Sequence, residues 1–438
     1  MIMLSFLGLI MIGTLLLMLP ISTAQRVATP FTDALFTATT ATCVTGLVVV
    51  PTFSHWSIFG QIVILILIQI GGLGVITVLS GLLIALNKRI GLGNKLLIQD
   101  AFNLNTLSGI VRFIKKVILG TFIVEGVGAI LYMIAFIPRY GAVGIWYAIF
   151  NSISAFCNAG IDILGNDSLA SFATDPLVNF VTCSLIILGG IGYIVWWDVV
   201  KIFKDRMKKP LLSLSLHTKI ALVSSLALII SGAALVFIFE YNNPETLGCL
   251  NLFDKIQVSL FQSITTRTAG FFTVPQELFR ESTSIASIIL MFIGGSPVGT
   301  AGGVKTVTMI ILVASAISAI RNKEQTVLFS RSISKSSLNK ALGVVFMSLS
   351  ISIISALLLS ALTPEAEAIN VIYEAVSATA TVGLTRGVTP ILNTAGKYVV
   401  IATMYLGRIG PISLAIAFNL KTTGKNLITY PAEDISVG

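Results

Sequence analysis

Four short segments of the chain share one pattern, and each of them ends in a glycine. They read FTATTATCVTG, FNSISAFCNAG, LFQSITTRTAG and YEAVSATATVG, over residues 36–46, 150–160, 260–270 and 373–383. Their final glycines follow one another at intervals of 114, 110 and 113 residues, which indicates fourfold internal repetition. Glycine permits backbone angles that other residues resist. A ring of backbone carbonyls can replace the hydration shell of a monovalent cation, and this is the chemistry that we expect of the four segments.

The candidate cation-binding residues are the five positions that end at each glycine. They are Thr42, Cys43, Val44, Thr45 and Gly46; Phe156, Cys157, Asn158, Ala159 and Gly160; Thr266, Arg267, Thr268, Ala269 and Gly270; and Thr379, Ala380, Thr381, Val382 and Gly383. We expect their backbone carbonyls to bind the ion. A competing interpretation is that the segments are ordinary polar connections, or that their small residues serve helix packing. Four copies in phase favour the first interpretation.

The first segment predicts how each glycine is positioned. Thr29 and Pro30 suit the N-cap and the first position of a helix that ends near Ala41. Such a helix has about 11 residues and is roughly 16 Å long, about half the thickness of a membrane. The residues from Thr42 to Val49 are mostly β-branched and favour an extended return. The segment therefore predicts a short pore helix and a re-entrant loop, which a membrane tolerates where the backbone lines a watery cavity.

The composition places these segments in a membrane protein. The chain has 438 residues, of which 55% are hydrophobic and 11% are charged, against roughly 25% charged residues in soluble domains. Stretches long enough to cross the roughly 30 Å hydrocarbon core lie at 3–20, 58–86, 113–137, 177–200, 217–239, 284–320, 341–362 and 396–419. We predict an all-α integral membrane protein with eight transmembrane spans, in which four covalently linked span–pore-loop–span units surround one pseudo-fourfold pore.

The charged residues predict the orientation of these units. The unit bounds are 1–86 for repeat 1, 87–204 for repeat 2, 205–320 for repeat 3 with a broken second span, 321–420 for repeat 4, and 421–438 for a tail. The connections 87–116, 201–219 and 321–340, with the tail, hold 19 of the 28 Lys and Arg residues. The positive-inside rule places them, and both termini, in the cytoplasm. The net charge of +9 is therefore a signal of topology, and we expect no nucleic-acid partner.

A second glycine-rich cluster follows each pore segment. The clusters read IGGLGV (70–75), LGGIGY (188–193), IGGSPVGTAGGVKT (293–306) and LGRIGP (406–411). In the first two copies we expect the small residues to serve close helix packing. The third copy holds five glycines and a proline between Gly294 and Gly303, so it cannot continue as one helix. It predicts two half-helices joined by an irregular loop that faces the pore.

This loop and one basic residue are the candidate gate. The residues are Gly294, Gly295, Ser296, Pro297, Gly299, Thr300, Gly302, Gly303, Lys305 and Arg408. Each glycine makes a helix costly by ~1 kcal/mol relative to alanine, so the loop can change shape at little cost. Arg408 is a charge inside an apolar span, and we expect it to donate to loop carbonyls near the cation path. A structural pairing of Arg408 with Glu125 is the alternative, and Lys305 is open between loop anchoring and snorkelling.

The four units resemble the Ktr/Trk/HKT superfamily of potassium and sodium transporters. The phrases TATCVTGL, AFCNAGID, TTRTAGFF and ATATVGLT look most like KtrB-type membrane subunits of bacterial Ktr potassium uptake systems, over essentially the whole chain. Trk-type relatives usually carry extra N-terminal spans, which are absent here. In the superfamily, glycine in all four filter segments goes with potassium selectivity, whereas some plant relatives with serine in the first prefer sodium. The resemblance therefore implies K+ as the transported ion.

The resemblance also implies the setting of the protein. The superfamily has an intramembrane gate loop in its third unit and a basic residue below the filter, at the positions of 294–303 and Arg408. KtrB-type subunits are typically homodimers with one pore per chain, in the bacterial cell membrane. They pair with a cytoplasmic ring of nucleotide-binding, KtrA-like subunits. The cytoplasmic connections of this chain, at about 20 to 30 residues, are too short for a regulatory domain of their own.

The sequence bears on three classes of function. The leading prediction is a K+-translocating subunit that is channel-like, is driven by the ion gradient and the membrane potential, and has no resident cofactor. The alternative is a secondary active cation transporter coupled to Na+ or H+, although repeats of equal orientation do not fit inverted-repeat folds. An enzyme is not expected, because H-E-x-x-H and G-x-S-x-G motifs are absent. Sodium as an activating ion and the regulatory nucleotide are left open.

Overall fold

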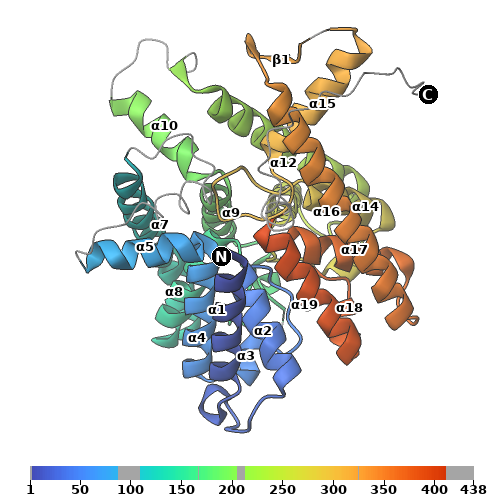
Figure 1. Cartoon of the computed structure of the whole chain (residues 1–438). Coiled ribbons are helices and arrows are strands. Elements are labelled where there is room, and N and C mark those ends of the chain that lie inside the picture. Colours follow the sequence, from blue (N-terminus) through green and yellow to red (C-terminus); the bar gives the residue numbers. More distant parts are fainter. Residues whose placement is uncertain (1, 87–108, 166, 205–212, 324, 411–438) are drawn as a thin grey trace, which may run out of the picture.

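Helices build most of the protein, in four successive groups that lie around a central region (Figure 1). The computed structural model describes residues 2–86, 109–165, 167–204, 213–323 and 325–410, and the structural statements below concern these residues. Residues 87–108 of the first basic connection, residues 205–212 of the second, residues 411–419 of the last predicted span and the tail 421–438 lie outside them. We keep the four predicted units as labels for the groups.

Each unit contains a first helix, a short pore helix and a second helix or helix pair. Unit 1 has α1 (Ile2–Leu17), η1 (Pro20–Ser22), α2 (Phe31–Cys43), α3 (Thr52–His55), α4 (Ile58–Leu73) and α5 (Val75–Ala85). Unit 2 has α7 (Ile110–Tyr140), α8 (Val143–Cys157), η2 (Ala170–Phe172), α9 (Pro176–Gly190) and α10 (Tyr193–Lys204). Unit 3 has α12 (Leu216–Glu240), α13 (Leu252–Thr265), η3 (Gln276–Leu278), α14 (Glu281–Phe292) and α15 (Thr306–Ile320). Unit 4 has β1 (Val327–Leu328), β2 (Arg331–Ser332), α16 (Lys335–Leu362), α17 (Ala368–Ala380), α18 (Val388–Ile391) and α19 (Thr394–Ile409).

The pore helices α2, α8, α13 and α17 are short, as predicted. They have 13, 15, 14 and 13 residues, so each is about 20 Å long at 1.5 Å per residue. The predicted bounds of α2 are wrong by two residues at its end, because the helix continues past Ala41 to Cys43. Threonine is tolerated there because Thr37 and Thr39 donate their hydroxyls to carbonyls four residues back.

The predicted N-cap of α2 is also wrong. Pro30 occupies the N-cap position and makes no side-chain cap, while the Thr29 hydroxyl lies 2.9 Å from Nε2 of His55 on α3. Partial burial lowers the pKa of His55, and the nearby Asp33 carboxylate opposes this shift. His55, in the connection between α2 and α4, thus packs against Thr29.

Contacts between successive units close into a ring. The second helix of each unit packs on the pore helix of the next: α4 on α8, α9 on α13, and α14 on α17. In the same way α19 of unit 4 packs on α2 of unit 1. There Nζ of Lys397 and Oδ1 of Asp33 form an ion pair at 2.7 Å. The order of the units around the ring is therefore their order in the chain.

Two of the predicted straight spans are bent. The pairs α4 with α5 and α9 with α10 each turn by 97°. The breaks occur at Gly74 and Gly192, whose φ angles of +86° and +91° a helix cannot accommodate. The clusters that we assigned to helix packing alone in units 1 and 2 therefore also end a helix. The predicted break in unit 3 is confirmed, because α14 ends at Phe292 and α15 begins at Thr306.

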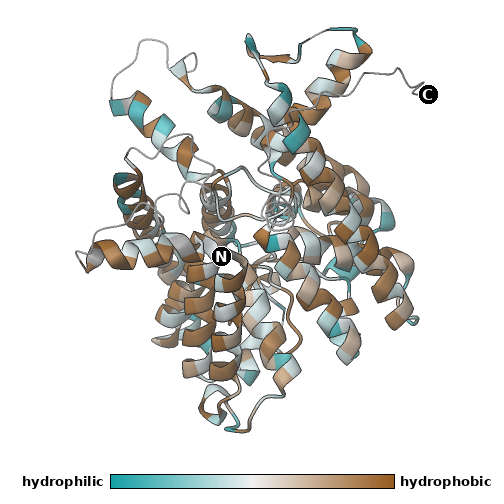
Figure 2. Ribbon diagram, in the orientation of Figure 1, coloured by the Kyte–Doolittle hydropathy of each residue, from teal (hydrophilic) through white to brown (hydrophobic). Residues whose placement is uncertain are grey.

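The surface of the helix bundle is apolar. Helices α7, α12 and α16 are long and apolar enough to cross a membrane, as are the two bent pairs if each counts as one span. Their large side chains face outward: Ile130 is 62% exposed, Ile238 is 67% exposed and Phe346 is 72% exposed. Hydrophilic residues gather at helix ends, on α10 and near β1 (Figure 2). Such an apolar belt suits lipid and not water, so the protein is a membrane protein.

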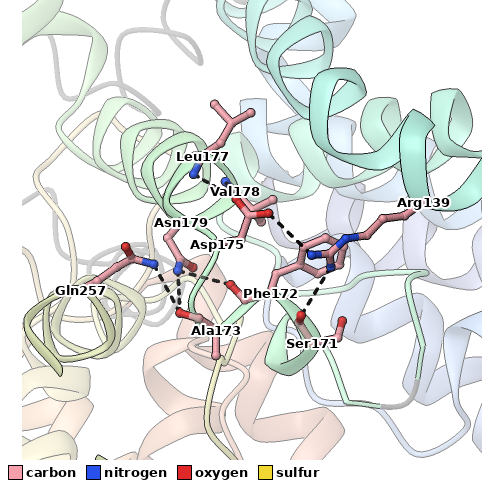
Figure 3. A network of polar contacts seen from close by, with 9 residues as sticks. All are labelled: Arg139, Ser171, Phe172, Ala173, Asp175, Leu177, Val178, Asn179 and Gln257. Atoms are coloured by element: carbon pink, nitrogen blue, oxygen red, sulfur yellow. Dashed lines mark hydrogen bonds and ion pairs between the residues drawn. The ribbon is translucent and has the colours of Figure 1, made fainter. Parts of the chain in front are cut away.

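The connection between α8 and α9 is fixed by a polar network (Figure 3). Asp175 caps α9 by accepting from two backbone N–H groups, and Arg139 at the end of α7 lies 3.9 Å from its carboxylate. The guanidinium of Arg139 also stacks 4.2 Å from the ring of Phe172. Asn179 of α9 and Gln257 of α13 both donate to the carbonyl of Ala173. The network joins the outer parts of units 2 and 3.

One small element was not predicted. Strands β1 and β2 pair antiparallel, with Val327 opposite Ser332, inside the basic connection 321–340. They are the only named strands among the described residues, so the chain is mostly helical rather than purely so.

Candidate functional site

The four predicted glycines lie next to one another. A Cβ atom added to any of them would come within 3.0 Å of the backbone carbonyl oxygen that precedes the glycine of the next unit. The pairs are Gly46 with Ala159, Gly160 with Ala269, Gly270 with Val382, and Gly383 with Thr45. The last pair joins unit 4 to unit 1, so the sequence of contacts closes on itself. The structure thus brings the four predicted segments together in a ring.

Backbone angles repeat around this ring. The residue two positions before each glycine is left-handed, with φ of 56° at Val44, 60° at Asn158, 71° at Thr268 and 51° at Thr381. This conformation ends a helix and is costly for a β-branched residue. Strain of this kind persists only where the surroundings impose it, and it concentrates at functional sites. The four glycines also have positive φ, whereas the residue directly before each glycine does not.

A hydroxyl group in the last turn of each pore helix holds the segment that follows. Thr40 accepts from the N–H of Gly46 at 3.0 Å, and Ser377 accepts from that of Gly383 at 3.1 Å. Ser154 contacts the backbone of Ile161, and Thr265 donates to the carbonyl of Phe271. Our sequence prediction missed these four anchors. A signal was present, because three of the four hydroxyls stand six residues before the glycine.

We expect Ser377→Ala to reduce discrimination between K+ and Na+ about three- to tenfold. The buried N–H of Gly383 would lose its acceptor, which costs about 1–3 kcal/mol and loosens the segment. The measurement is relative uptake of the two ions by vesicles that contain the purified variant. Ser377→Thr is the matched control, because unit 1 uses threonine at the same register, and it should behave like the parent. Equal discrimination in the alanine variant would contradict the role of the anchor.

The ring has a negative electrostatic potential from helix ends, and buried polar side-chain atoms without a hydrogen-bond partner in the described part of the chain lie beside it. The C-terminal ends of the four pore helices lie within a few residues of the glycines, and helix C-termini carry partial negative charge. Several buried side-chain atoms here have no hydrogen-bond partner among the described residues, namely Oγ1 of Thr42, Thr45 and Thr381 and the amide of Asn158. Buried polar atoms are rarely left unpaired. The arrangement suits a cation, with or without water, at the ring.

Known proteins share the sequence and the fold of this chain. The TrkH family, whose members are described as cation transport proteins, matches residues 2–429. The chain belongs to the TrkH family. "Ktr system potassium uptake protein B" of Bacillus subtilis (strain 168) is 43% identical over 98% of this chain and 94% of its own length. "Potassium/sodium uptake protein NtpJ" of Enterococcus hirae is 36% identical over 99% of this chain and 95% of its own length.

A solved structure shares the fold of this TrkH family member. The crystal structure of the potassium transporter TrkH from Vibrio parahaemolyticus matches with a TM-score of 0.73 at 16% identity, over 94% of this chain and 84% of that chain. The predicted resemblance to Ktr/Trk proteins is confirmed. The chain is therefore a membrane protein of a family of K+ transport proteins.

The loop between α14 and α15 lies directly against the ring of this TrkH family protein. Its ends are pinned together, since Gly294 N donates to Val304 O at 2.9 Å and Val304 N donates to Phe292 O at 3.1 Å. Its middle bonds to the end of α9, where Gly189 O accepts from Thr300 N at 3.0 Å. The predicted residues 294–303 thus form one irregular segment held by the backbones of units 2 and 3.

The loop is in direct contact with the ring segments. The Thr300 hydroxyl donates to Phe156 O at 2.9 Å, and Gly302 N donates to the Thr268 hydroxyl at 3.0 Å. A Cβ added to Gly302 would also collide with Thr381. Three of the four ring segments therefore contact the loop. Sequence separation concealed this, because Thr300 and Phe156 lie 144 residues apart.

Arg408, at the end of α19, holds the loop and α4 together. Its guanidinium donates to Thr300 O at 2.7 Å and to Gly71 O at 2.6 Å. The alternative pairing with Glu125 is wrong: within the described ranges the two form no ion pair, and Glu125 accepts from Nε2 of Gln69 at 3.2 Å. The expected donation to loop carbonyls is confirmed.

The role of Lys305 is also visible. Nζ of Lys305 donates to Ala301 O at 2.6 Å, so the side chain folds back on its own loop. Loop anchoring therefore fits better than snorkelling. Two basic groups, those of Lys305 and Arg408, thus bind the carbonyls of consecutive loop residues, Ala301 and Thr300.

Proposed function

We propose that the glycine ring is a K+ selectivity filter and that the chain is the channel-like, K+-translocating subunit of a bacterial uptake system. The observation that carries this proposal is the cyclic contact of Gly46, Gly160, Gly270 and Gly383, each against the carbonyl of the next segment. Carbonyl rings are the means by which filters replace the hydration shell of K+.

The backbone angles support carbonyl coordination. Positive φ at the second residue before each glycine and at the glycine itself, with ordinary φ between them, departs from the regular strand geometry that fixes the direction of successive carbonyls. A regular strand of L-residues would point them alternately to opposite sides. The converging helix C-termini add negative potential at the same point. Ions are therefore attracted to the ring and bound there through oxygen atoms.

The remaining architecture follows as part of the proposal. Eight spans in four units, with the bounds given above, surround one pseudo-fourfold pore, and both termini face the cytoplasm. The bent pairs count as one span each, and the half-helices α14 and α15 together as another. Supporting observations are the closed ring of contacts and the apolar belt. The loop 294–303 with Lys305 and Arg408 acts as the gate, since it lies against the filter and two basic groups hold it.

Ion flux tests this function and separates it from the alternative. Purified protein in vesicles should take up K+ down an imposed gradient or membrane potential with no coupling ion present. Na+ is measured in parallel, because one relative carries both ions in its name. Transport that stops unless Na+ or H+ is supplied as a coupled ion would instead establish secondary active transport. Empty vesicles are the control.

We expect the chain to co-purify, as a homodimer, with a soluble ring of nucleotide-binding subunits through its basic connections. In the part of 321–340 that the structure describes, Lys323, Arg331, Lys335 and Lys340 are exposed. Surface charge supplies attraction and orientation, so the complex should weaken as salt shortens the Debye length from ~30 Å at 0.01 M to ~3 Å at 1 M. Replacing Lys335 and Lys340 with glutamate should weaken it further. The test is to express the parent together with the neighbouring genes that encode soluble proteins. If the parent then purified alone at low salt, this prediction would be contradicted.

A further inference from the structure

Arg267 differs from its counterparts in the other three units. The position three residues before each filter glycine holds Cys43, Cys157, Arg267 and Ala380. All four are buried, and Arg267 is only 9% exposed. The part of the chain that the structure describes contains no carboxylate paired with it. A buried, unpaired charge is costly and is retained where it has a function.

The guanidinium points behind the ring, toward α12 and the loop. It donates to the Ser225 hydroxyl at 3.2 Å, to Ser225 O at 3.4 Å and to Gly294 O, at the start of the loop, at 3.4 Å. Nε has no partner among the described residues. Beside it lies a small cavity of about 20 Å³, whose lining is mostly isoleucine side chains, with Ser225 and Gly295 among the other residues.

The break in unit 3 explains why an arginine is needed here. In the other units a glycine of the second helix packs directly on the carbonyl four residues before the filter glycine: Gly71 on Thr42, Gly189 on Phe156, and Gly407 on Thr379. In unit 3 the helix ends at Phe292, and a Cβ on Gly294 would meet Gly302 of the loop instead of Thr266. The third filter segment therefore lacks this direct backbone support. The Arg267 side chain instead connects this segment to Gly294, at the start of the loop.

We propose that Arg267 is a positioning residue that ties the gate loop to the third filter segment. This inference rests on the proposed function. The bonds of 3.2–3.4 Å are longer than the usual 2.9–3.0 Å, so the tie is weak and the loop can leave it at little cost. When the loop moves, Gly294 O is lost as an acceptor. Arg267 thus favours the observed position of the loop without locking it.

Basal K+ flux through the isolated subunit tests the tie. Arg267→Met removes every donor, and we expect flux to rise about fivefold. Arg267→Gln keeps an N–H donor group without the charge, and we expect less than half of that rise. The matched control is Lys255→Met, which removes another buried cation. Lys255 lies on α13, the helix that precedes Arg267, and bonds to Tyr241 O at 2.9 Å and not to the loop. It should conduct like the parent, and thermal melting of each variant reports folding.

Each outcome decides the proposal. Flux at the parent level in folded Arg267→Met would overturn it, as would an equal rise in the methionine and glutamine variants, because the charge alone would then act. If Arg267→Met does not fold, Ser225→Ala takes its place, with an expected twofold rise, and no change there overturns the inference. If the parent protein itself showed no preference for K+ over Na+, the proposed filter function would be wrong. The two failures are therefore distinguishable.

Discussion

Gly383→Ser is expected to cut the preference for K+ over Na+ about tenfold, which corresponds to about 1.4 kcal/mol. The glycine has φ of +94°, which a serine adopts only with strain, and its new Cβ would collide with Thr45 O and with Gly46. The carbonyl ring would then widen or tilt at the junction of units 4 and 1. Gly46→Ser should act in the same direction, since its Cβ would lie 2.6 Å from Ala159 O. Relative uptake of the two ions into vesicles is the measurement.

A glycine outside the ring supplies the control for this experiment. Gly343 lies on α16, and a Cβ there would meet nothing within 4 Å. Gly343→Ser should therefore leave both selectivity and folding at the parent level. If serine at all four ring glycines left the relative uptake unchanged, the assignment of the filter would have to be abandoned.

Arg408→Ala is expected to raise basal K+ flux about tenfold in the absence of any partner. The substitution removes the donors that hold Thr300 O and Gly71 O, so the loop loses its link to α4 and α19. Charge-assisted bonds of this kind contribute about 1.5–3 kcal/mol each, enough to shift a loop that is otherwise weakly held. Flux into vesicles without regulatory protein is the measurement. Arg331→Ala, which removes an exposed guanidinium of β2, is the matched control.

Deleting Gly299–Gly303 should also raise flux, but it should lower selectivity as well. Selectivity should fall because Thr300 and Gly302 bond to ring segments 2 and 3, and the deletion removes both bonds. A deletion that left the flux at the parent level would assign the loop to packing. So would loss of K+ preference without any gain in flux.

The meeting of the four glycine segments could be predicted from the sequence because its signal is local and repeated. Four glycines in phase, β-branched residues before them and short helices can be read without knowing the fold. The bends at Gly74 and Gly192 escaped prediction, since apolar residues on both sides also suit a straight span, and only the φ angle distinguishes the two. The contacts of Arg267, and that of Arg408 with Gly71, escaped for another reason. Their partners lie up to 337 residues away, and side-chain direction is set by packing rather than by pattern.

Closure of the ring by α19 and α2 has a consequence for biosynthesis. The ion pair at this junction joins Lys397 and Asp33, which are 364 residues apart. At roughly 5–20 residues per second, the ribosome needs about 20 to 70 seconds to make the chain between them. During this time the hydroxyl-rich end of α2 lies in the bilayer without α19, the helix of unit 4 that packs on it in the complete protein. Nascent chains should therefore depend on the insertion machinery or on lipid to shelter unit 1, and a chain truncated before α19 should be degraded rather than form a leaky pore.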